Sequence, residues 1–506
     1  MEQAMTTGAN AGAYREKYRP QYHFTPPTMW MNDPNGMVYF EGEYHLFYQH
    51  HPDGMTWGPM HWGHAVSRDL VHWEHLPIAL APDGNGAIFS GSAVVDWTDS
   101  CGLLGGRPGL VALFTHADHY PGSTRPRQRQ SLAYSTDRGR TWTMYAGNPV
   151  LSDERFTDFR DPKVIWYEPG AYWVMVLAAG DRVRLYTSGD LKAWTFASEF
   201  GADEGSHDGV WECPDLIELP VEGSAGQRKW ALLVSIGDHP ELADGSKTQY
   251  FVGSFDGLAF VNEASAERVL WLDHGRDNYA GVTWADAPRD GGRKVAVGWM
   301  SNWKYANQTP TSTWRSAMTL PRELSLRETP EGLRLVQRPI SELQGLRQAG
   351  REVLLRDAAV EPGENLLAGV CGDVYELVCE LEPGTAAEIG FKLRTSAEEE
   401  TVIGYRAAEQ TLIVDRRRSG ESSFHDGFAC RHELRVPLRK GRLRLQLFVD
   451  QSSVELFVHD GEIVLTDQIF PDPASTGLAL YAEGGEGRAV ELQLYPLKSM
   501  YALVGV

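Results

Sequence analysis

The sequence is poor in the features that mark several common classes of protein. Its 506 residues include five cysteines and no CxxC pair, so it indicates neither a disulfide framework nor a thiolate zinc site. No apolar run reaches membrane-spanning length, and the N-terminus has no apolar segment of the kind found in a signal peptide. We therefore expect a cytoplasmic protein without a membrane partner, or a secreted one if its native N-terminus is missing.

Positive charge is also scarce. There are 47 lysines and arginines against 68 aspartates and glutamates, a net charge of −21. This balance argues against nucleic acid, polyphosphate or an anionic membrane as the main partner. A neutral ligand is compatible with it. The 16 tryptophans and 20 tyrosines offer aromatic faces that could stack on sugar rings, although such residues also build protein cores.

Long helical periodicity is lacking as well. Short alternating or apolar runs, separated by Gly, Pro, Asn and Asp, indicate an all-β protein. One pattern recurs, in which an apolar strand is followed by Ser, an Asp turn and an aromatic residue that opens the next strand. Its copies are "AVSRDLVHW" (65–73), "AYSTDRGRTW" (133–142), "LYTSGDLKAW" (185–194) and "FVGSFDGLAF" (251–260).

Another predicted hairpin precedes each copy, at 36–49, 92–116, 163–179 and 215–235. A fifth hairpin at 281–300 is followed by 313–324, where the Ser-Asp turn has degenerated. Two hairpins per unit and five units predict a five-bladed β-propeller. We place it at 26–340, after an N-terminal extension at 1–25. The polar segment 341–351 is the expected linker, and 352–506 shows the alternation and turn spacing of an antiparallel β-sandwich.

Three carboxylates occupy equivalent places in this repeat. Asp33 in "WMNDPNG", Asp161 in "FRDP" and Glu212 in "WECPD" lie at the heads of blades one, three and four. Each acid-proline pair alone is ordinary turn chemistry, and Pro-Asn-Gly after Asp33 predicts a tight turn. In a propeller, however, the first strand of each blade lines the central axis. The three acids are therefore expected to converge on one funnel.

Clustered acids raise one another's pKa and divide their protonation roles, as glycoside hydrolysis requires. A Ca²⁺ site is the rival interpretation, although Ca²⁺ favours ligands on one loop with more carbonyl oxygens. The HxxH spacings of "HWGHAVSRDLVHWEH" (61–75) suggest zinc. On strands, residues i and i+3 point to opposite faces, so structural histidines are the better interpretation.

"WMNDPNG", "FSGS", "FRDP", "WECPD" and "GWM" together resemble the sequence blocks of glycoside hydrolase family 32, which includes invertases, levanases, exo-inulinases and fructosyltransferases. The resemblance extends into the C-terminal part through "FVDQSSVELFVHDGE" (448–462). It implies a propeller followed by a sandwich, and a retaining hydrolase that needs no metal or organic cofactor.

The resemblance also implies roles for individual residues. Asp33 matches the nucleophile, Glu212 the general acid/base and Asp161 the transition-state stabiliser. Arg160 would bind the same sugar and help to keep Asp161 ionised. Further matches to the pocket that binds the terminal fructose are Asn32, Gln49, Trp57, Phe89, Ser90, Asp277 and Trp314.

The resemblance predicts an exo-acting fructan β-fructosidase that also cleaves sucrose, because 298–324 is more similar to levanases and exo-inulinases than to sucrose-6-phosphate hydrolases. Lys304 and Arg315 in that segment are cations that a substrate phosphate could use, although a lone cation is more often a solvated surface charge. A sucrose-directed invertase, a sucrose-6-phosphate hydrolase and a fructosyltransferase are the alternatives among enzymes. A carbohydrate-binding propeller without catalysis is the alternative from another class. The oligomeric state stays open.

Overall fold

The structure is a computed structural model that describes residues 14–240, 242–287 and 293–503. Its described residues form two compact units. Thr28–Ser341 and Phe457–Asp467 make one, and the residues up to Pro27, Glu342–Leu456 and those from Gln468 onward make the other. Part of the predicted extension 1–25 lies outside the described residues.

Strands make up nearly all of the regular structure in the described residues. The helices are short 3-10 turns: η1 (Glu168–Gly170), η2 (Ala306–Gln308), η3 (Ser341–Leu346) and η4 (Met500–Leu503). Over the described part of the chain, no helix has the length and apolar character needed to cross a membrane.

Five sheets make up the blades of the first unit. Blade one contains β1 (Met29–Phe40), β2 (Glu43–His51), β3 (His61–Ser67) and β4 (Trp73–Leu80). Blade two contains β5 (Ala87–Asp96), β6 (Gly109–His119), β7 (Pro126–Ser135), β8 (Thr143–Met144) and β9 (Leu151–Ser152). Blade three contains β10 (Phe159–Tyr167), β11 (Tyr172–Ala179), β12 (Val183–Ser188) and β13 (Thr195–Phe200).

The last two blades follow the same plan. Blade four contains β14 (Trp211–Pro220), β15 (Arg228–Ile236), β16 (Lys247–Phe255), β17 (Phe260–Asn262) and β18 (Leu270–Trp271). Blade five contains β19 (Tyr279–Thr283), β20 (Lys294–Met300), β22 (Ala317–Met318), β23 (Arg322–Thr329) and β24 (Gly332–Pro339). The short strand β21 (Trp314–Arg315) joins the sheet of blade one, in parallel with β1.

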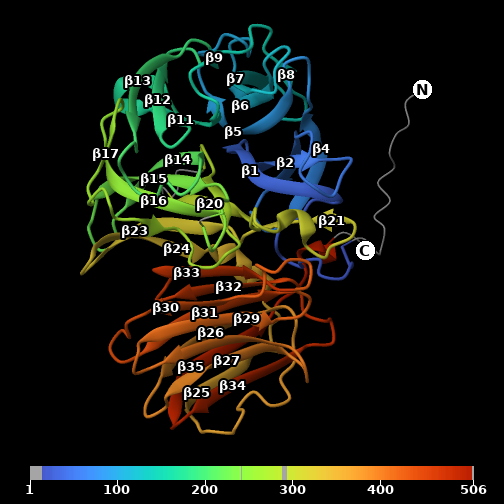
Figure 1. Cartoon of the computed structure of the whole chain (residues 1–506), viewed down its shortest axis with the longest axis vertical. Coiled ribbons are helices and arrows are strands. Elements are labelled where there is room, and N and C mark those ends of the chain that lie inside the picture. Colours follow the sequence, from blue (N-terminus) through green and yellow to red (C-terminus); the bar gives the residue numbers. More distant parts are fainter. Residues whose placement is uncertain (1–13, 241, 288–292, 504–506) are drawn as a thin grey trace. The chain divides into compact units, whose positions relative to one another are not determined.

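The first strands of the five blades form a closed ring. Each of β1, β5, β10, β14 and β19 contacts the next, and β19 contacts β1 again. Figure 1 shows the five sheets following one another around a common centre in the order of the chain. Apolar side chains fill the space between neighbouring blades; Leu113 of blade two, for example, packs in one cluster with Met175 of blade three. The predicted five-bladed propeller is confirmed.

The Ser-Asp pattern forms the turn between the third and fourth strands of the first four blades. The aspartates accept hydrogen bonds from backbone N–H groups two to four residues further on, and they are Asp69, Asp137, Asp190 and Asp256. The residue after each aspartate has a left-handed backbone, at Leu70, Arg138, Leu191 and Gly257. The aspartate bonds therefore fix a turn that most residues adopt only at a cost.

Blade five differs from the prediction. We expected 313–324 to supply its outer hairpin, but β21 in this segment pairs with β1, and the outer strands are β23 and β24. The segment has a different task, since its parallel pairing ties the last blade to the first and closes the ring. The turn of the predicted hairpin 281–300 falls at 288–292, outside the described residues.

Two further antiparallel sheets confirm the predicted β-sandwich. One has six strands in the order β25 (Val353–Val360), β35 (Gly487–Pro496), β26 (Tyr375–Glu382), β31 (Leu443–Asp450), β32 (Ser453–Val458) and β33 (Ile463–Gln468). The other has five strands in the order β30 (Arg431–Arg435), β29 (Thr411–Arg418), β28 (Glu400–Arg406), β27 (Glu388–Thr395) and β34 (Gly477–Glu483).

Candidate active site

The same irregularity occurs in all five axial strands, and it positions the site. In each strand two residues face one residue of the neighbouring strand, which is a β-bulge. The bulged pairs are Asn32–Asp33, Phe89–Ser90, Asp161–Pro162, Cys213–Pro214 and Ala280–Gly281. This corrects the predicted turn before the first strand: Asp33 and Pro34 lie inside β1. A bulge re-aims a side chain without ending the strand, and here it does so at one level of every blade.

Gly36 shows why the "DPNG" run suits this bulge. Its backbone is left-handed, with φ of +54°. A Cβ atom here would lie 2.6 Å from Phe47 Cδ2 and 2.7 Å from Trp62 Cζ3. Only glycine fits both the conformation and the space.

Asp33 is buried, with 9% of its surface exposed, and donors surround its carboxylate. Ser90 Oγ donates to Oδ2 at 2.7 Å, and Asn32 Nδ2 donates to Oδ1 at 3.1 Å. The Cys213 thiol lies 3.5 Å from Oδ2. Burial and the nearby Glu212 raise the pKa of Asp33, and these hydrogen bonds oppose the rise. The carboxylate is thus held in place by groups that favour its ionised form.

Asp161 lies on the other side of the same thiol. Cys213 Sγ is 3.6 Å from Asp161 Oδ2, and the Cys213 backbone N–H donates to that oxygen at 3.0 Å. The Asp161 backbone is left-handed, with φ of +64°, and its N–H donates to Thr115 Oγ1. Burial, together with the charges of Glu212 and Asp33, raises the pKa of Asp161 to about 7 against the opposing effect of Arg160.

Glu212 completes the cluster and is the most accessible of the three acids, with 22% of its side chain exposed. Arg160 donates to Oε1 through Nε at 3.2 Å and Nη2 at 2.9 Å. The Tyr279 hydroxyl donates to Oε2. Arg160 also donates through Nη1 to Asp158, whereas its Nε is 3.9 Å from Asp161. The guanidinium therefore hydrogen-bonds to Glu212 rather than to Asp161. Its charge lowers the pKa of Asp161, as expected, but burial and the two neighbouring acids outweigh that effect.

The arrangement suits proton transfer coupled to attack by a carboxylate. Two buried acids and the partly exposed Glu212 beside them cannot all be ionised without strong repulsion, so the cluster retains a proton near neutral pH. Arg160 and the Tyr279 hydroxyl both donate to Glu212 and fix its carboxyl group beside the other two acids. A carboxylate with a proton donor close by is the chemical requirement for cleaving a glycosidic bond.

The other predicted residues fall into two groups. Asn32, Phe89 and Ser90 lie in the bulges beside the acids, and the exposed Trp57 packs edge-on against Phe89 at a centroid distance of 5.9 Å. The remaining three are buried and support the site from behind. The Gln49 amide donates to Asn35 Oδ1, and the Asp277 carboxylate accepts from the Tyr305 hydroxyl. Trp314 lies in β21, which pairs with β1.

Sequence reasoning missed Cys213, which was interpreted only as one of five unpaired thiols. Cys213 directly follows Glu212, so its bulged position could have been found by aligning the five strand heads. Tyr279, at the head of blade five, was expected to face the funnel, but its bond to Glu212 was not predicted, because this contact joins residues 67 apart.

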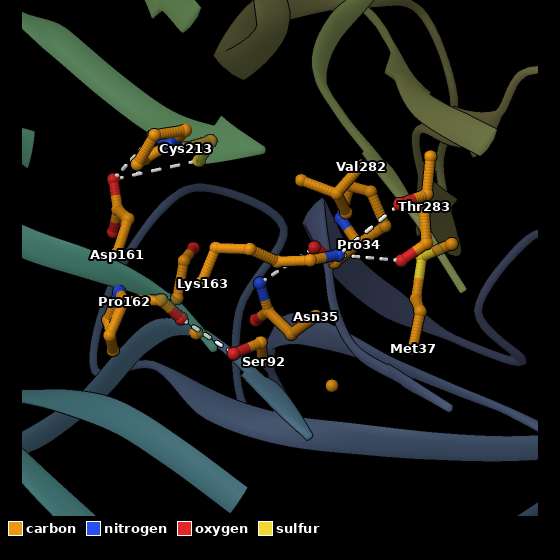
Figure 2. Close-up of a pocket in the computed structure, with 14 residues that line it drawn as sticks. Pro34, Asn35, Met37, Ser92, Asp161, Pro162, Lys163, Cys213, Val282 and Thr283 are labelled. Atoms are coloured by element: carbon orange, nitrogen blue, oxygen red, sulfur yellow. Dashed lines mark hydrogen bonds between the residues drawn. The ribbon is translucent and has the colours of Figure 1, made fainter. Parts of the chain in front are cut away.

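The axial strands enclose a small pocket that is lined by Asp161 and Lys163, and Lys163 belongs to a buried ion pair. Figure 2 shows Lys163 reaching toward Thr283 within this pocket. The Lys163 ammonium lies 3.2 Å from the Asp215 carboxylate and donates to the Thr283 carbonyl at 2.8 Å. The Thr283 backbone N–H and hydroxyl both donate to Asp215. These bonds join blades three, four and five directly below Asp161.

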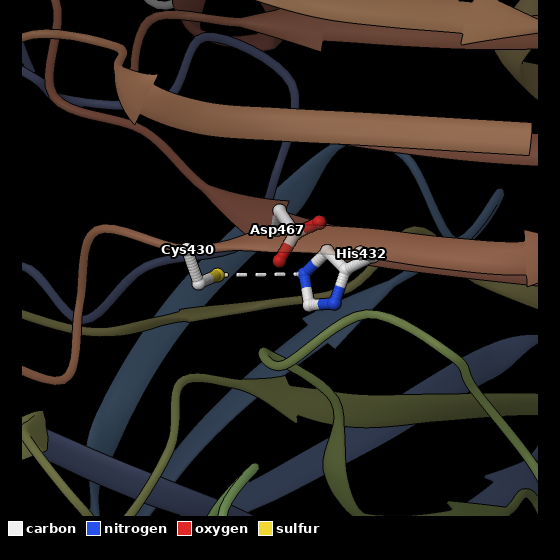
Figure 3. A group of neighbouring side chains, drawn as sticks. All are labelled: Cys430, His432 and Asp467. Carbon is white, nitrogen blue, oxygen red and sulfur yellow. Dashed lines mark hydrogen bonds between the residues drawn. The ribbon is translucent and has the colours of Figure 1, made fainter.

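Candidate metal ligands elsewhere have other partners. His64 bonds to His45 and His72 to Asp69, as expected for structural histidines. In the cluster of Asp96, Asp99 and Cys101, backbone N–H groups donate to both carboxylates. Cys430 and His432 point toward each other at the start of β30, with 3.6 Å between Sγ and Nε2 (Figure 3).

Two family descriptions match consecutive parts of the chain. They are "Glycosyl hydrolases family 32 N-terminal domain" over residues 23–339 and "Glycosyl hydrolases family 32 C terminal" over residues 342–496. The chain belongs to glycosyl hydrolase family 32. The resemblance carried by its sequence blocks is confirmed.

This family 32 protein has relatives that match over nearly its whole length. A levanase of Bacillus subtilis (strain 168) is 53% identical over 499 residues, which are 97% of this chain and 72% of that one. An extracellular exo-inulinase of Aspergillus ficuum is 38% identical over 528 residues, and the match covers 97% of each chain. The crystal structure of an exo-inulinase from Aspergillus awamori has a TM-score of 0.87 at 35% identity, covering 96% of this chain and 99% of that one.

Proposed function

We propose that this family 32 protein is an exo-acting β-fructosidase. It removes terminal non-reducing β-D-fructofuranosyl units from fructans such as inulin and levan, and it also hydrolyses sucrose. The cluster of three acids carries this proposal: Asp33 and Asp161 lie within the bulges of their strands, and Glu212 directly precedes the bulge of blade four. Relatives named levanase and exo-inulinase support fructans as the substrate class.

The proposed reaction is a double displacement with retention. The Asp33 carboxylate attacks C2 of the terminal fructosyl unit while Glu212 gives its proton to the leaving oxygen, so that a fructosyl ester forms and the glycosidic bond breaks. Glu212 then takes a proton from water, which attacks C2, releases fructose and restores the Asp33 carboxylate. The charge that develops on C2 and the ring oxygen is positive, and the neighbouring carboxylate of Asp161 would stabilise it when ionised.

The two cations considered for a substrate phosphate have main-chain partners. Lys304 Nζ donates to the Leu242 carbonyl, and the Arg315 guanidinium donates to several carbonyl groups. Neither cation needs a phosphate to satisfy it. This observation favours unphosphorylated substrates over sucrose-6-phosphate.

A time course of products from inulin and levan tests the proposal. We expect fructose alone from the first minutes, with no fructose oligosaccharides, and a kcat/KM for sucrose-6-phosphate no higher than for sucrose. Early release of oligosaccharides would contradict exo action, and strong preference for the phosphorylated sugar would contradict the substrate class. Asp33→Ala should abolish turnover while fructan binding persists. Near-normal hydrolysis by this variant would overturn Asp33 as the nucleophile.

A further inference from the structure

Trp57 is the exposed aromatic ring at the edge of the acid cluster. Its exposed fraction is 46%, which is high for tryptophan. The ring contacts Phe89, and the next residue, Ser90, donates to the Asp33 carboxylate. An exposed tryptophan in this place is a platform on which the apolar face of a sugar can stack.

The loop that carries Trp57 is anchored at four consecutive residues by four different partners. The Gly54 carbonyl accepts from Trp30 N–H of β1, and the Met55 carbonyl accepts from Arg315 of β21. The Thr56 carbonyl lies 2.8 Å from His51 Nδ1, and Trp57 N–H donates to Asn307 Oδ1 at 2.9 Å. A loop held at four consecutive residues is a rigid support rather than a flexible connection.

Arg315 holds both sides of this arrangement. Its exposed fraction is 9%, and within the described residues its hydrogen bonds go to main-chain carbonyls. These carbonyls belong to Met55 at 2.7 Å, Asn307, Thr309 at 2.8 Å and Thr311 at 3.5 Å. The guanidinium thus joins the Trp57 loop to segment 307–311, which itself supplies the Asn307 acceptor. Its flat fork of donors suits several carbonyls at once, whereas a lysine ammonium is a single point of charge.

Burial of this arginine has a cost that packing alone does not explain. Desolvation lowers its pKa, and among the residues that the structure describes no carboxylate opposes that effect. A buried cation is retained where its hydrogen bonds organise the surrounding backbone.

We propose that Arg315 is a positioning residue for substrate specificity, which fixes the Trp57 platform by clamping loop 51–58 to segment 307–311. The inference rests on the proposed function, because the platform is useful only if a sugar binds over the acids. Arg315 itself does not touch the substrate. Its effect is therefore on KM, through Trp57, and not on the chemical step.

Kinetics of four variants on sucrose and inulin test this role: Arg315→Lys, Arg315→Met, Trp57→Ala and the double variant Arg315→Met/Trp57→Ala. Loss of a well-placed aromatic contact corresponds to a rise in KM of about three- to tenfold. We expect this rise in all three single variants, with kcat changed less than about twofold. The double variant should be no worse than Trp57→Ala, since both changes remove the same contact. Arg107→Met, at an exposed arginine, is the control and should leave both constants unchanged.

Three results would overturn the proposal. They are an unchanged KM in Arg315→Met, a wild-type KM in Arg315→Lys, and additive losses in the double variant. Thermal unfolding checks that each variant is folded. If Arg315→Met does not fold, Asn307→Ala is used in its place, because this change removes only the acceptor of the Trp57 N–H. An unchanged KM in Asn307→Ala also counts against the proposal. Wild-type protein that releases no fructose would instead refute the proposed function.

Discussion

Replacing Ser90 by alanine tests how the site keeps Asp33 ionised. The Ser90 hydroxyl donates to Asp33 Oδ2 at 2.7 Å in a buried setting. A donor to a carboxylate stabilises the charged form, and this bond is one of those that oppose the raised pKa of Asp33. Its removal therefore raises that pKa further, so Asp33 loses its charge at a higher pH than in the wild type.

The size of the effect follows from the strength of the bond. A hydrogen bond to a charged group contributes about 1.5–3 kcal/mol, and one pKa unit corresponds to about 1.4 kcal/mol. The acid limb of kcat/KM, which reports on the free enzyme, should move upward by roughly one to two pH units. At pH values well above this acid limb, Ser90→Ala should lose less activity than it does on the limb, because Asn32 and Cys213 still hold the Asp33 carboxylate.

The assay is fructose release from sucrose between pH 3 and 8 for the wild type, Ser90→Ala and Ser92→Ala. Ser92 is the matched control, since it lies in the same strand and its hydroxyl donates to the Pro162 carbonyl rather than to an acid. Ser92→Ala should keep the wild-type pH profile even if its stability drops. An Ser90→Ala profile that is lower at every pH but not displaced would refute the electrostatic role and leave only a packing role.

The remaining predictions concern other parts of the molecule. Tyr279→Phe removes the hydroxyl donor to Glu212 and should lower kcat/KM about tenfold with no change in thermal midpoint; an unchanged kcat/KM would contradict the contact. Lys163→Met leaves the Asp215 carboxylate buried without its cation and should lower the free energy of unfolding by about 3–5 kcal/mol in urea titrations, which a loss below about 1 kcal/mol would refute. His23 donates to two buried acids, and its pKa is raised to about 9 in spite of burial. Its contribution is complete below the unfolded value near 6.5 and is lost as pH rises through about 9, so His23→Gln should flatten the decline in stability between these pH values.

Much of the architecture could be predicted because it repeats. The Ser-Asp turns of the first four blades are local structures, in which an aspartate bonds to backbone only a few residues away, so their pattern is visible in the sequence. Blade five was harder to predict. Its segment β21 pairs with β1, which lies almost at the other end of the propeller sequence, and no local pattern marks this pairing.

The sequence by itself determined that Asp33, Asp161 and Glu212 meet, because equivalent positions of a closed repeat must converge on its axis. Only the tertiary structure decided how they meet. The bulges that aim them depend on pairing with the neighbouring strand, and a period-2 pattern does not reveal an extra residue. Three contacts join segments that are distant in the sequence, and only packing in three dimensions selects them. They are the bonds from Arg160 to Glu212, the contact of the Cys213 thiol with two acids, and the bond from Arg315 to the Trp57 loop.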